Sequence, residues 1–303
     1  MKLRRILQQD KKGFAYQILE DGIWREIDQY NPFTHTSDWS LETSIHLNDG
    51  DLQLPFQPLS FRDFMLYEKH AIDAARGYVK RFIPPAYWVS RLYEGVTKRT
   101  FPQFKPSPLW YRQPTYYMSN HLAFVPSGTT VVAPTYTKAL DYELELGFVL
   151  SKPLFNATPE EAIKAIGWFV VLNDFSARDV QLAEMKSGFG PQKSKHFMSS
   201  MSEILTSADE VLPILDKLVG AVYVNDELVT KVTTAGMRYS LGQALAHASC
   251  CEHLYPGELF GTGTLPGGSG MENGRWLKTG DRLHLMIEGL GDIRHTISWF
   301  SKT

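Results

Sequence analysis

The chain has 303 residues, of which 43% are hydrophobic and 21% are charged. This composition is typical of a folded globular protein and excludes a disordered or collagen-like chain. The length allows one large domain or two ordinary ones. The 31 Lys and Arg residues nearly balance the 33 Asp and Glu residues, so no net charge attracts the protein to nucleic acid or to an acidic membrane surface.

The two cysteines, Cys250 and Cys251, are adjacent. A bridge between neighbours closes almost no loop, so a disulfide-built secreted domain is not indicated. We expect this pair to be buried as small hydrophobic residues. The N-terminal stretch MKLRRILQQDKKG lacks the apolar segment of a signal peptide, and no stretch approaches the roughly 20 apolar residues of a membrane span. We therefore expect a cytoplasmic protein.

Short strands separated by turns are predicted for residues 1–54. Alternating residues flank Asp21-Gly22, a pair typical of a tight hairpin turn. We expect a small N-terminal β domain over residues 1–60, followed by a catalytic domain over residues 61–303.

The segment 63–78 has apolar residues at helical spacing, which predicts a helix that Asp63 caps and Gly77 ends. On that helix, Asp63 and His70 would lie two turns apart on one face. The next segment, 80–114, contains six prolines and seven basic residues against a single acidic one. The prolines favour an irregular segment, which is typical either of a lid over a binding site or of a strap packed on the surface.

Strands predominate from residue 115 onward, with two helical insertions. The pattern favours a β-rich α+β fold. Strands are expected at 123–126, 129–133, 140–150 and 168–172 and in hairpins over 220–232 and 282–299, and helices are expected at 158–166 and 240–253.

Two glutamates on the expected strand 140–150 point to one face, because side chains alternate along a strand. If Glu143 and Glu145 were buried they would repel each other, and a divalent cation would relieve that cost. A solvent-facing strand with two exposed glutamates is the alternative.

Asp174 follows the apolar strand 168–172. A strand–helix–strand path can return it to the two glutamates. Three carboxylates indicate a Mg²⁺, Mn²⁺ or Ca²⁺ site rather than a zinc site. The alternative role for an Asn-Asp pair is a turn or a helix cap.

His70 is a candidate general base, although a lone histidine is more often a structural residue. The loop from Gly188 to Lys195, GFGPQKSK, has the Gly, Ser and Lys composition of a loop that holds an anion. It lacks the GxxxxGK[ST] spacing of a phosphate-binding loop, so a nucleotide is not predicted.

Taken together, these segments resemble the fumarylacetoacetate hydrolase superfamily over residues 61–303. Each motif is modest by itself, but they occur jointly and in the family's order. The matching stretches are Asp63-Phe64 with His70, DYELE at 141–145, NDFSARDVQ at 173–181, Gly190-Pro191 with Lys195, WLKTGD at 276–281 and EGLG at 288–291.

The resemblance implies a mixed β-sandwich roll that binds Mg²⁺, with Ca²⁺ or Mn²⁺ as alternatives. The family's metal ligands fall on Glu143, Glu145, Asp174 and, as in larger members, Asp63. Its catalytic histidine falls on His70. Its substrate-binding positions fall on Tyr117, Arg178, Gln181 and Lys195. The resemblance also makes Lys195 catalytic, since it would stabilise an oxyanion, and it implies a lid within 80–114 and a homodimer.

Three departures from the family bear on the substrate. Met65 and Met185 stand where tyrosines are expected. The glutamate that helps to orient the attacking water falls within Pro266-Gly267-Gly268-Ser269, which contains no acid. Glu272 is nearby and is the expected catalytic replacement.

The resemblance implies a hydrolase that cleaves a carbon–carbon bond in a 1,3-diketo acid, such as an acylpyruvate or a fumarylacetoacetate-like compound. His70 would deprotonate the attacking water. A 2-oxo acid decarboxylase, isomerase or tautomerase with the same site is the alternative. A catalytically silent dimeric scaffold is a third hypothesis, and nucleic-acid binding by 80–114 is a distant fourth, so neither a nucleic acid nor a membrane is an expected partner.

Overall fold

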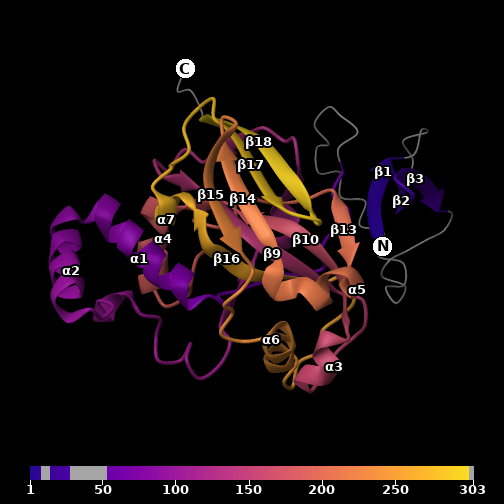
Figure 1. Ribbon diagram of the computed structural model, residues 1–303, viewed down its shortest axis with the longest axis horizontal. Coiled ribbons are helices and arrows are strands. Elements are labelled where there is room, and N and C mark those ends of the chain that lie inside the picture. The colour runs from indigo at the N-terminus through magenta and orange to yellow at the C-terminus, as the bar shows by residue number, and fades with distance from the viewer. Residues whose placement is uncertain (8–13, 28–52, 300–303) are drawn as a thin grey trace.

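A computed structural model of the protein describes residues 1–7, 14–27 and 53–299. Two β-sheets pack face to face, and α-helices lie around their edges (Figure 1). The sheets contain both parallel and antiparallel pairs, which agrees with the β-rich α+β fold expected from the sequence. None of the helices within these ranges is long and apolar enough to cross a membrane.

The larger sheet has eleven strands. Nine of them are, in order across the sheet, β3 (Ile23–Ile27), β2 (Phe14–Glu20), β1 (Lys2–Leu7), β13 (Ile204–Ser207), β10 (Ile166–Asp174), β9 (Glu143–Leu150), β16 (Leu259–Ser269), β4 (Phe61–Phe64) and β5 (Tyr116–Ser119). The other two, β12 (Ser199–Met201) and β6 (Phe124–Pro126), continue from β10. A separate two-stranded ladder joins β8 (Leu140–Asp141) to β11 (Ser176–Ala177).

The smaller sheet has five strands, whose order is β15 (Glu227–Thr233), β14 (Val219–Val224), β17 (Arg282–Ile287), β18 (Gly291–Trp299) and β7 (Val131–Ala133). The α-helices are α1 (Glu68–Phe82), α2 (Pro84–Thr97), α3 (Pro159–Ile163), α4 (Arg178–Lys186), α5 (Ala208–Val211), α6 (Leu241–Ala248) and α7 (Gly270–Asn273). Three short 3₁₀ helices are η1 (Pro102–Phe104), η2 (His121–Ala123) and η3 (Leu212–Lys217).

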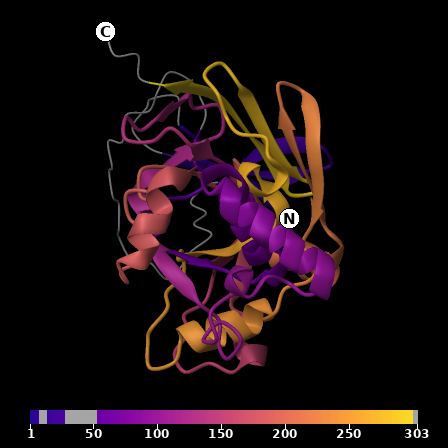
Figure 2. The same ribbon diagram turned by 90° about the vertical axis from the view of Figure 1, so that its left-hand side faces the viewer.

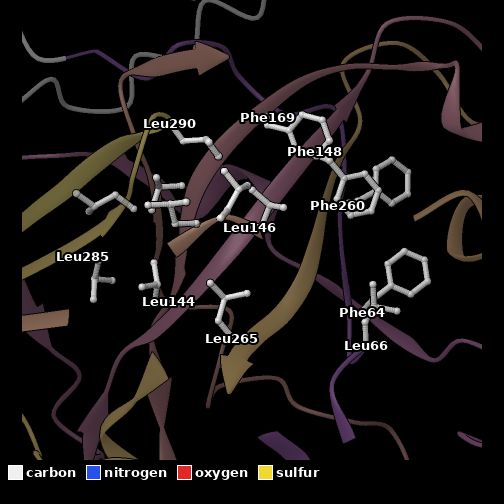
Figure 3. Close-up of a cluster of buried hydrophobic side chains, with 14 of the residues drawn as sticks. Phe64, Leu66, Leu144, Leu146, Phe148, Phe169, Phe260, Leu265, Leu285 and Leu290 are labelled. Carbon is white, nitrogen blue, oxygen red and sulfur yellow. The ribbon is translucent and has the colours of Figure 1, made fainter. Parts of the chain in front are cut away.

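Alternation along β9 decides which face of the large sheet carries chemistry. Leu144, Leu146 and Phe148 point into the main core between the two sheets, where they pack with residues such as Leu285 (Figure 3). Val149 points to the opposite face and belongs to a second, smaller apolar cluster. Because side chains alternate along a strand, Glu143 and Glu145 lie on the same face as Val149, away from the main core.

The helix predicted over 63–78 is wrong at its start. Asp63 lies in β4, which pairs with β16 on one side and with β5 on the other. Helix α1 begins at Glu68, and Asp63 does not cap it. Long-range strand pairing overrides the local helical pattern here, so Asp63 and His70 do not share a helix face.

Gly77 does not end the helix, since α1 continues to Phe82. The segment 80–114 is not irregular either, because α2 occupies its first half. Pro84 and Pro85 occupy the first turn of α2, where a missing N–H costs no hydrogen bond. The role of this segment as a lid stays a prediction.

The later elements mostly agree with their predictions. The three expected hairpins form at Asp21-Gly22, Asn225-Asp226 and Gly289-Leu290-Gly291. A capping box starts α3 at Thr158. Some boundaries differ: Tyr142 interrupts the strand 140–150, helix 158–166 ends at Ile163, and helix 240–253 ends at Ala248. The strands expected at 123–126 and 129–133 pair with β12 and β18.

The first strands join the large sheet, because β1 pairs with β13. Residues 8–13 and 28–52 of the stretch expected to form strands lie outside the described ranges. The prediction that Cys250 and Cys251 are buried is wrong, since both thiols are exposed. The reason is that α6 ends at Ala248, so the pair lies in the exposed turn after the helix.

Candidate active site

Three carboxylates from three strands meet on the face of the large sheet opposite the main core. Asp63 of β4, Glu145 of β9 and Asp174 of β10 each offer an oxygen, and these oxygens all lie within 4.8 Å of one another. All three side chains are buried. The sheet register explains the meeting. Leu172 pairs with Glu145, so Asp174, two residues on, emerges on the same face.

Gly261 of β16 makes room for the carboxylates between β9 and β4. It pairs with Gly147 on one side and with Asp63 on the other. A Cβ at this position would lie 2.4 Å from Asp63 Oδ1 and 2.7 Å from Glu145 Oε2. Any side chain would therefore occupy the space where the two carboxylates converge.

The cluster has the donor set of a hard divalent cation. Asp63 Oδ1 and both carboxylate oxygens of Glu145 are buried without a hydrogen-bond partner. Burial, followed by the charge of Asp174, raises the pKa of Asp63 to about 8. Burial, together with the charge of Asp63, raises the pKa of Glu145 well above its usual range. Oxygen ligands that are buried and unpartnered fit Mg²⁺, Mn²⁺ or Ca²⁺.

Glu143 faces the same side but has different partners from the three-carboxylate cluster. Arg178 Nη2 donates to its Oε1 at 2.6 Å, and Lys195 Nζ donates to its Oε2. Burial by itself would raise the pKa of Glu143, but these two cations outweigh it and hold the pKa below its usual range. Lys195 also donates to Asp174 Oδ2 at 2.6 Å. Lys195 therefore links Glu143 to the cluster.

The predicted substrate-binding residues border this group. Tyr117 donates its hydroxyl proton to Asp174 Oδ2. Arg178 donates to Gln181 Oε1 at 3.0 Å. The structure thus brings the positions expected to contact substrate together with the carboxylates, on β5, α4 and the loop that follows α4.

His70 and Glu272 form a close pair beside the cluster. His70 Nδ1 lies 3.0 Å from Glu272 Oε2, and His70 Nε2 lies 3.8 Å from Glu143 Oε1. Burial lowers the pKa of His70 more than any other single cause, but the charge of Glu272, hydrogen bonding to Glu272 and the charge of Glu143 together outweigh it, so the pKa is raised. Glu272 is itself held in place, because it accepts from Gly267 N at 2.9 Å and from Ser269 Oγ at 2.8 Å.

Asp141 connects Arg178 to the helix that carries Glu272. The sequence analysis assigned Asp141 no role of its own. It accepts from Arg178 Nε at 2.8 Å. It also accepts from the backbone N–H groups of Gly270 and Met271, at 2.8 and 3.0 Å, at the start of α7. Asp141 thereby fixes both Arg178 and the helix that carries Glu272.

The loop from Gly188 to Lys195, which was expected to hold an anion, binds the carboxylate of a glutamate from the same chain. The carboxylate of Glu184 accepts from the backbone N–H groups of Gln192, Lys193 and Ser194 at 2.8 to 3.0 Å, and from Ser194 Oγ at 2.6 Å. These bonds shape the turn immediately before Lys195. In the sequence, only the presence of Glu184 on the preceding helix indicates this contact.

Close contact between α1 and α7 sets the distance between His70 and Glu272. A Cβ on Gly77 would lie 1.7 Å from the carbonyl oxygen of Met271. We expect Gly77→Ala to force the helices apart, to cost about 1–3 kcal/mol of stability and to lower kcat. Gly95→Ala on α2 is the matched control, because nothing lies within 4 Å of its Cβ.

Chemical denaturation and steady-state kinetics measure both effects. The control is expected to be neutral, or more stable by about 0.5–1 kcal/mol, because alanine favours a helix. Equal stability and kcat for Gly77→Ala and the wild type would show that the close contact does not position the pair.

Comparisons with known proteins show the family to which the chain belongs. Residues 90–298 match the model of the family described as fumarylacetoacetate (FAA) hydrolase, C-terminal. The chain belongs to the fumarylacetoacetate hydrolase superfamily, a family of enzymes.

Curated relatives include the mitochondrial oxaloacetate tautomerase FAHD1 of Homo sapiens, which is 31% identical over 59% of this chain and 78% of its own length. The Pongo abelii protein of the same name is 30% identical over 61% of this chain and 81% of its own length.

Solved structures share the fold. A fumarylacetoacetate hydrolase of Exiguobacterium antarcticum has a TM-score of 0.70 and 20% identity, covering 99% of this chain and all of its own. A fumarylpyruvate hydrolase of Pseudomonas aeruginosa, solved with Mn²⁺ and pyruvate, has a TM-score of 0.59 and 19% identity, covering 84% and 94%. A Mycobacterium smegmatis 5-carboxymethyl-2-hydroxymuconate delta-isomerase has a TM-score of 0.67 and 19% identity, covering all of both chains.

Proposed function

We propose that the protein is a divalent-metal-dependent hydrolase that cleaves a carbon–carbon bond in a 1,3-diketo acid, with His70 as the general base. The observation that carries the proposal is the His70–Glu272 pair beside three buried carboxylates. A histidine oriented by a carboxylate is suited to deprotonate water. A tautomerase, by contrast, only moves a proton between carbon and oxygen and needs no base to activate an attacking water.

The metal ligands we assign are Asp63, Glu145 and Asp174, with Glu143 joining them if Lys195 releases its carboxylate. A cation held there would supply Lewis-acid chemistry by drawing electron density from a substrate carbonyl. We assign Mg²⁺, with Ca²⁺ or Mn²⁺ as alternatives; the P. aeruginosa fumarylpyruvate hydrolase was solved with Mn²⁺.

The residues of this chain would divide the remaining work. Glu272 fixes the ring of His70, and His70 removes a proton from water as the oxygen adds to the distal carbonyl. The bond between that carbonyl carbon and the adjacent methylene carbon breaks, and the methylene carbon takes up a proton. The products are two carboxylic acids. Lys195, Arg178, Gln181 and Tyr117 would hold the substrate's carboxylate and stabilise oxyanion charge.

The second candidate is a 2-oxo acid tautomerase, decarboxylase or isomerase at the same site. Two curated relatives are named oxaloacetate tautomerases, and one structural neighbour is named a delta-isomerase. The loss of the family's tyrosines at Met65 and Met185 also favours a substrate other than fumarylacetoacetate.

Three further expectations from the sequence analysis remain proposals. We propose a homodimer, a cytoplasmic location, and a division into a small N-terminal β domain (1–60) and a catalytic domain (61–303). Light scattering of the purified protein tests the first. The curated relatives named here are mitochondrial proteins, so localisation of the tagged protein in cells tests the second.

The decisive assay follows the loss of enol absorbance for a panel of acylpyruvates, other diketo acids and oxaloacetate. Each substrate is run with Mg²⁺ and again with excess EDTA, and the products are identified. We expect EDTA-sensitive cleavage into two acids. Absorbance loss without cleavage would replace the hydrolase with a tautomerase, and CO₂ release would replace it with a decarboxylase.

A further inference from the structure

A pocket of about 530 Å³ lies beside the His70–Glu272 pair, between α1, α2 and the chain around α7. Figures 1 and 2 show α1 and α2, in purple, at the end of the molecule away from the N-terminal strands. From the sequence, the basic segment 80–114 was interpreted as a lid, as a surface strap or, more distantly, as a nucleic-acid contact. The proposed chemistry at the carboxylates does not use the pocket.

Positive charge dominates the pocket. Five basic and two acidic side chains line it. Arg76 is neutralised, since it contacts Glu94 at 2.8 Å and Asp73 at 2.6 Å. Lys80 and Arg91 form no ion pair with any residue in the described ranges. Cations that gather around a hollow without counter-charges attract an anion.

One wall of the pocket has a group suited to planar anions. The guanidinium of Arg81 lies over the ring of Trp276, 4.0 Å from its centroid. Stacking on an aromatic ring holds the guanidinium plane while leaving its edge free to donate. An edge held in this way matches a carboxylate or a phosphate, which accepts two parallel hydrogen bonds.

Glu272 is the residue that the pocket and the proposed active site share. This side chain lines the pocket, and its carboxylate is the one that lies beside His70. Lys69, Arg76 and Lys80 recur along one stripe of α1, so the pocket runs outward along that helix. At 1.5 Å per residue, Lys80 lies about 15 Å along the axis from His70.

We propose that this pocket binds a distal anionic group of an elongated substrate, a carboxylate or a phosphate carried at the end opposite the reacting 2-oxo acid. The inference rests on the proposed function and narrows it to substrates with two charged ends. Lys80, Arg81 and Arg91 hold the distal anion, while the reacting end lies at the carboxylates. A compact acid such as oxaloacetate does not span this distance.

The test compares two substrates that differ only at the far end, dodecanoylpyruvate and dodecanedioylpyruvate, the second of which ends in a carboxylate. For the double variant Lys80→Gln and Arg91→Gln, we expect the KM of dodecanedioylpyruvate to rise about 10- to 100-fold, as for lost hydrogen bonds to a charged group. The KM of dodecanoylpyruvate and both kcat values should stay within about twofold.

Arg99→Gln is the matched control, because it removes one charge from the same segment without lining the pocket. It is expected to leave all four constants unchanged. Equal KM changes for the two substrates, or none, in an enzyme that turns both over would overturn the distal anion site and leave the proposed function standing.

Calorimetry on the metal-free protein separates the two proposals if no diketo acid is turned over. The probes are adipate and inorganic phosphate. Binding of either to the wild type and to Arg99→Gln, with loss in the double variant, supports the site and shows which anion it prefers. If neither probe binds the wild type, the anion site is wrong whatever the enzyme's reaction.

Discussion

Replacing His70 with alanine is expected to lower kcat by about 10²- to 10⁴-fold, the range by which a positioned general base accelerates a reaction. The imidazole is buried, and its Nδ1 lies 3.0 Å from Glu272 Oε2. KM should change little, because His70 acts on water rather than on the substrate's charged ends. His247→Ala, on α6 away from the site, is the control and should leave kcat unchanged.

Glu272→Gln tests whether the pair acts as one unit. The charge of Glu272 raises the pKa of His70, so its removal lowers that pKa. The base form then persists to lower pH, and the acidic limb of the kcat/KM profile shifts to lower pH while kcat falls. The double variant should be no slower than His70→Ala alone, because residues of one unit are not additive. If the two single-variant losses in kcat multiply in the double variant, His70 and Glu272 act independently.

Metal ions are expected to stabilise the protein strongly, and Glu145→Gln should abolish that effect. A metal ion that binds only the folded state adds about 2.7 kcal/mol to the free energy of unfolding at a metal concentration 100 times Kd. The wild-type Tm should therefore rise with Mg²⁺ or Mn²⁺ and fall back with EDTA. Glu145 is central to the cluster, and both of its oxygens are unpartnered.

The same substitution should raise the Tm of the metal-free protein, because it removes a buried acid that faces Asp63 and Asp174. Opposite effects with and without metal distinguish a metal site from a merely destabilised core. Glu288→Gln, an exposed change of the same chemistry, is the control and should retain the full metal response. A metal response that survives in Glu145→Gln would remove this residue from the ligand set.

Local patterns were enough to predict the parts of the site that lie within one strand or one turn. The alternation of DYELE predicted the shared face of Glu143 and Glu145, and the apolar strand before Asp174 predicted its place at a strand end. Turn residues predicted the hairpins, and the N-cap Thr158 followed by Pro159 predicted the start of α3. The resemblance to the family supplied the order of the motifs and the roles of His70 and Lys195.

Contacts between distant segments were beyond local patterns. Asp63 was predicted to lie on a helix because the apolar residues after it recur at helical spacing. It lies instead in β4, a strand of only four residues, whose strand character comes from partners far along the chain. The meeting of His70 and Glu272 depends on the close approach at Gly77, which reads locally as a helix stop. The Pro-rich start of α2 reads as irregular, although two prolines suit a first helical turn.

The parallel pairing of β4 with β16 has a consequence for how the protein folds. Arg62 and Glu258, at the edge of this pairing, are 196 positions apart. Closing so long a loop is slow, and non-local strand pairs form late in folding. Asp63 cannot join Glu145 before β16 is in place. Metal should therefore slow unfolding while leaving the refolding rate nearly unchanged.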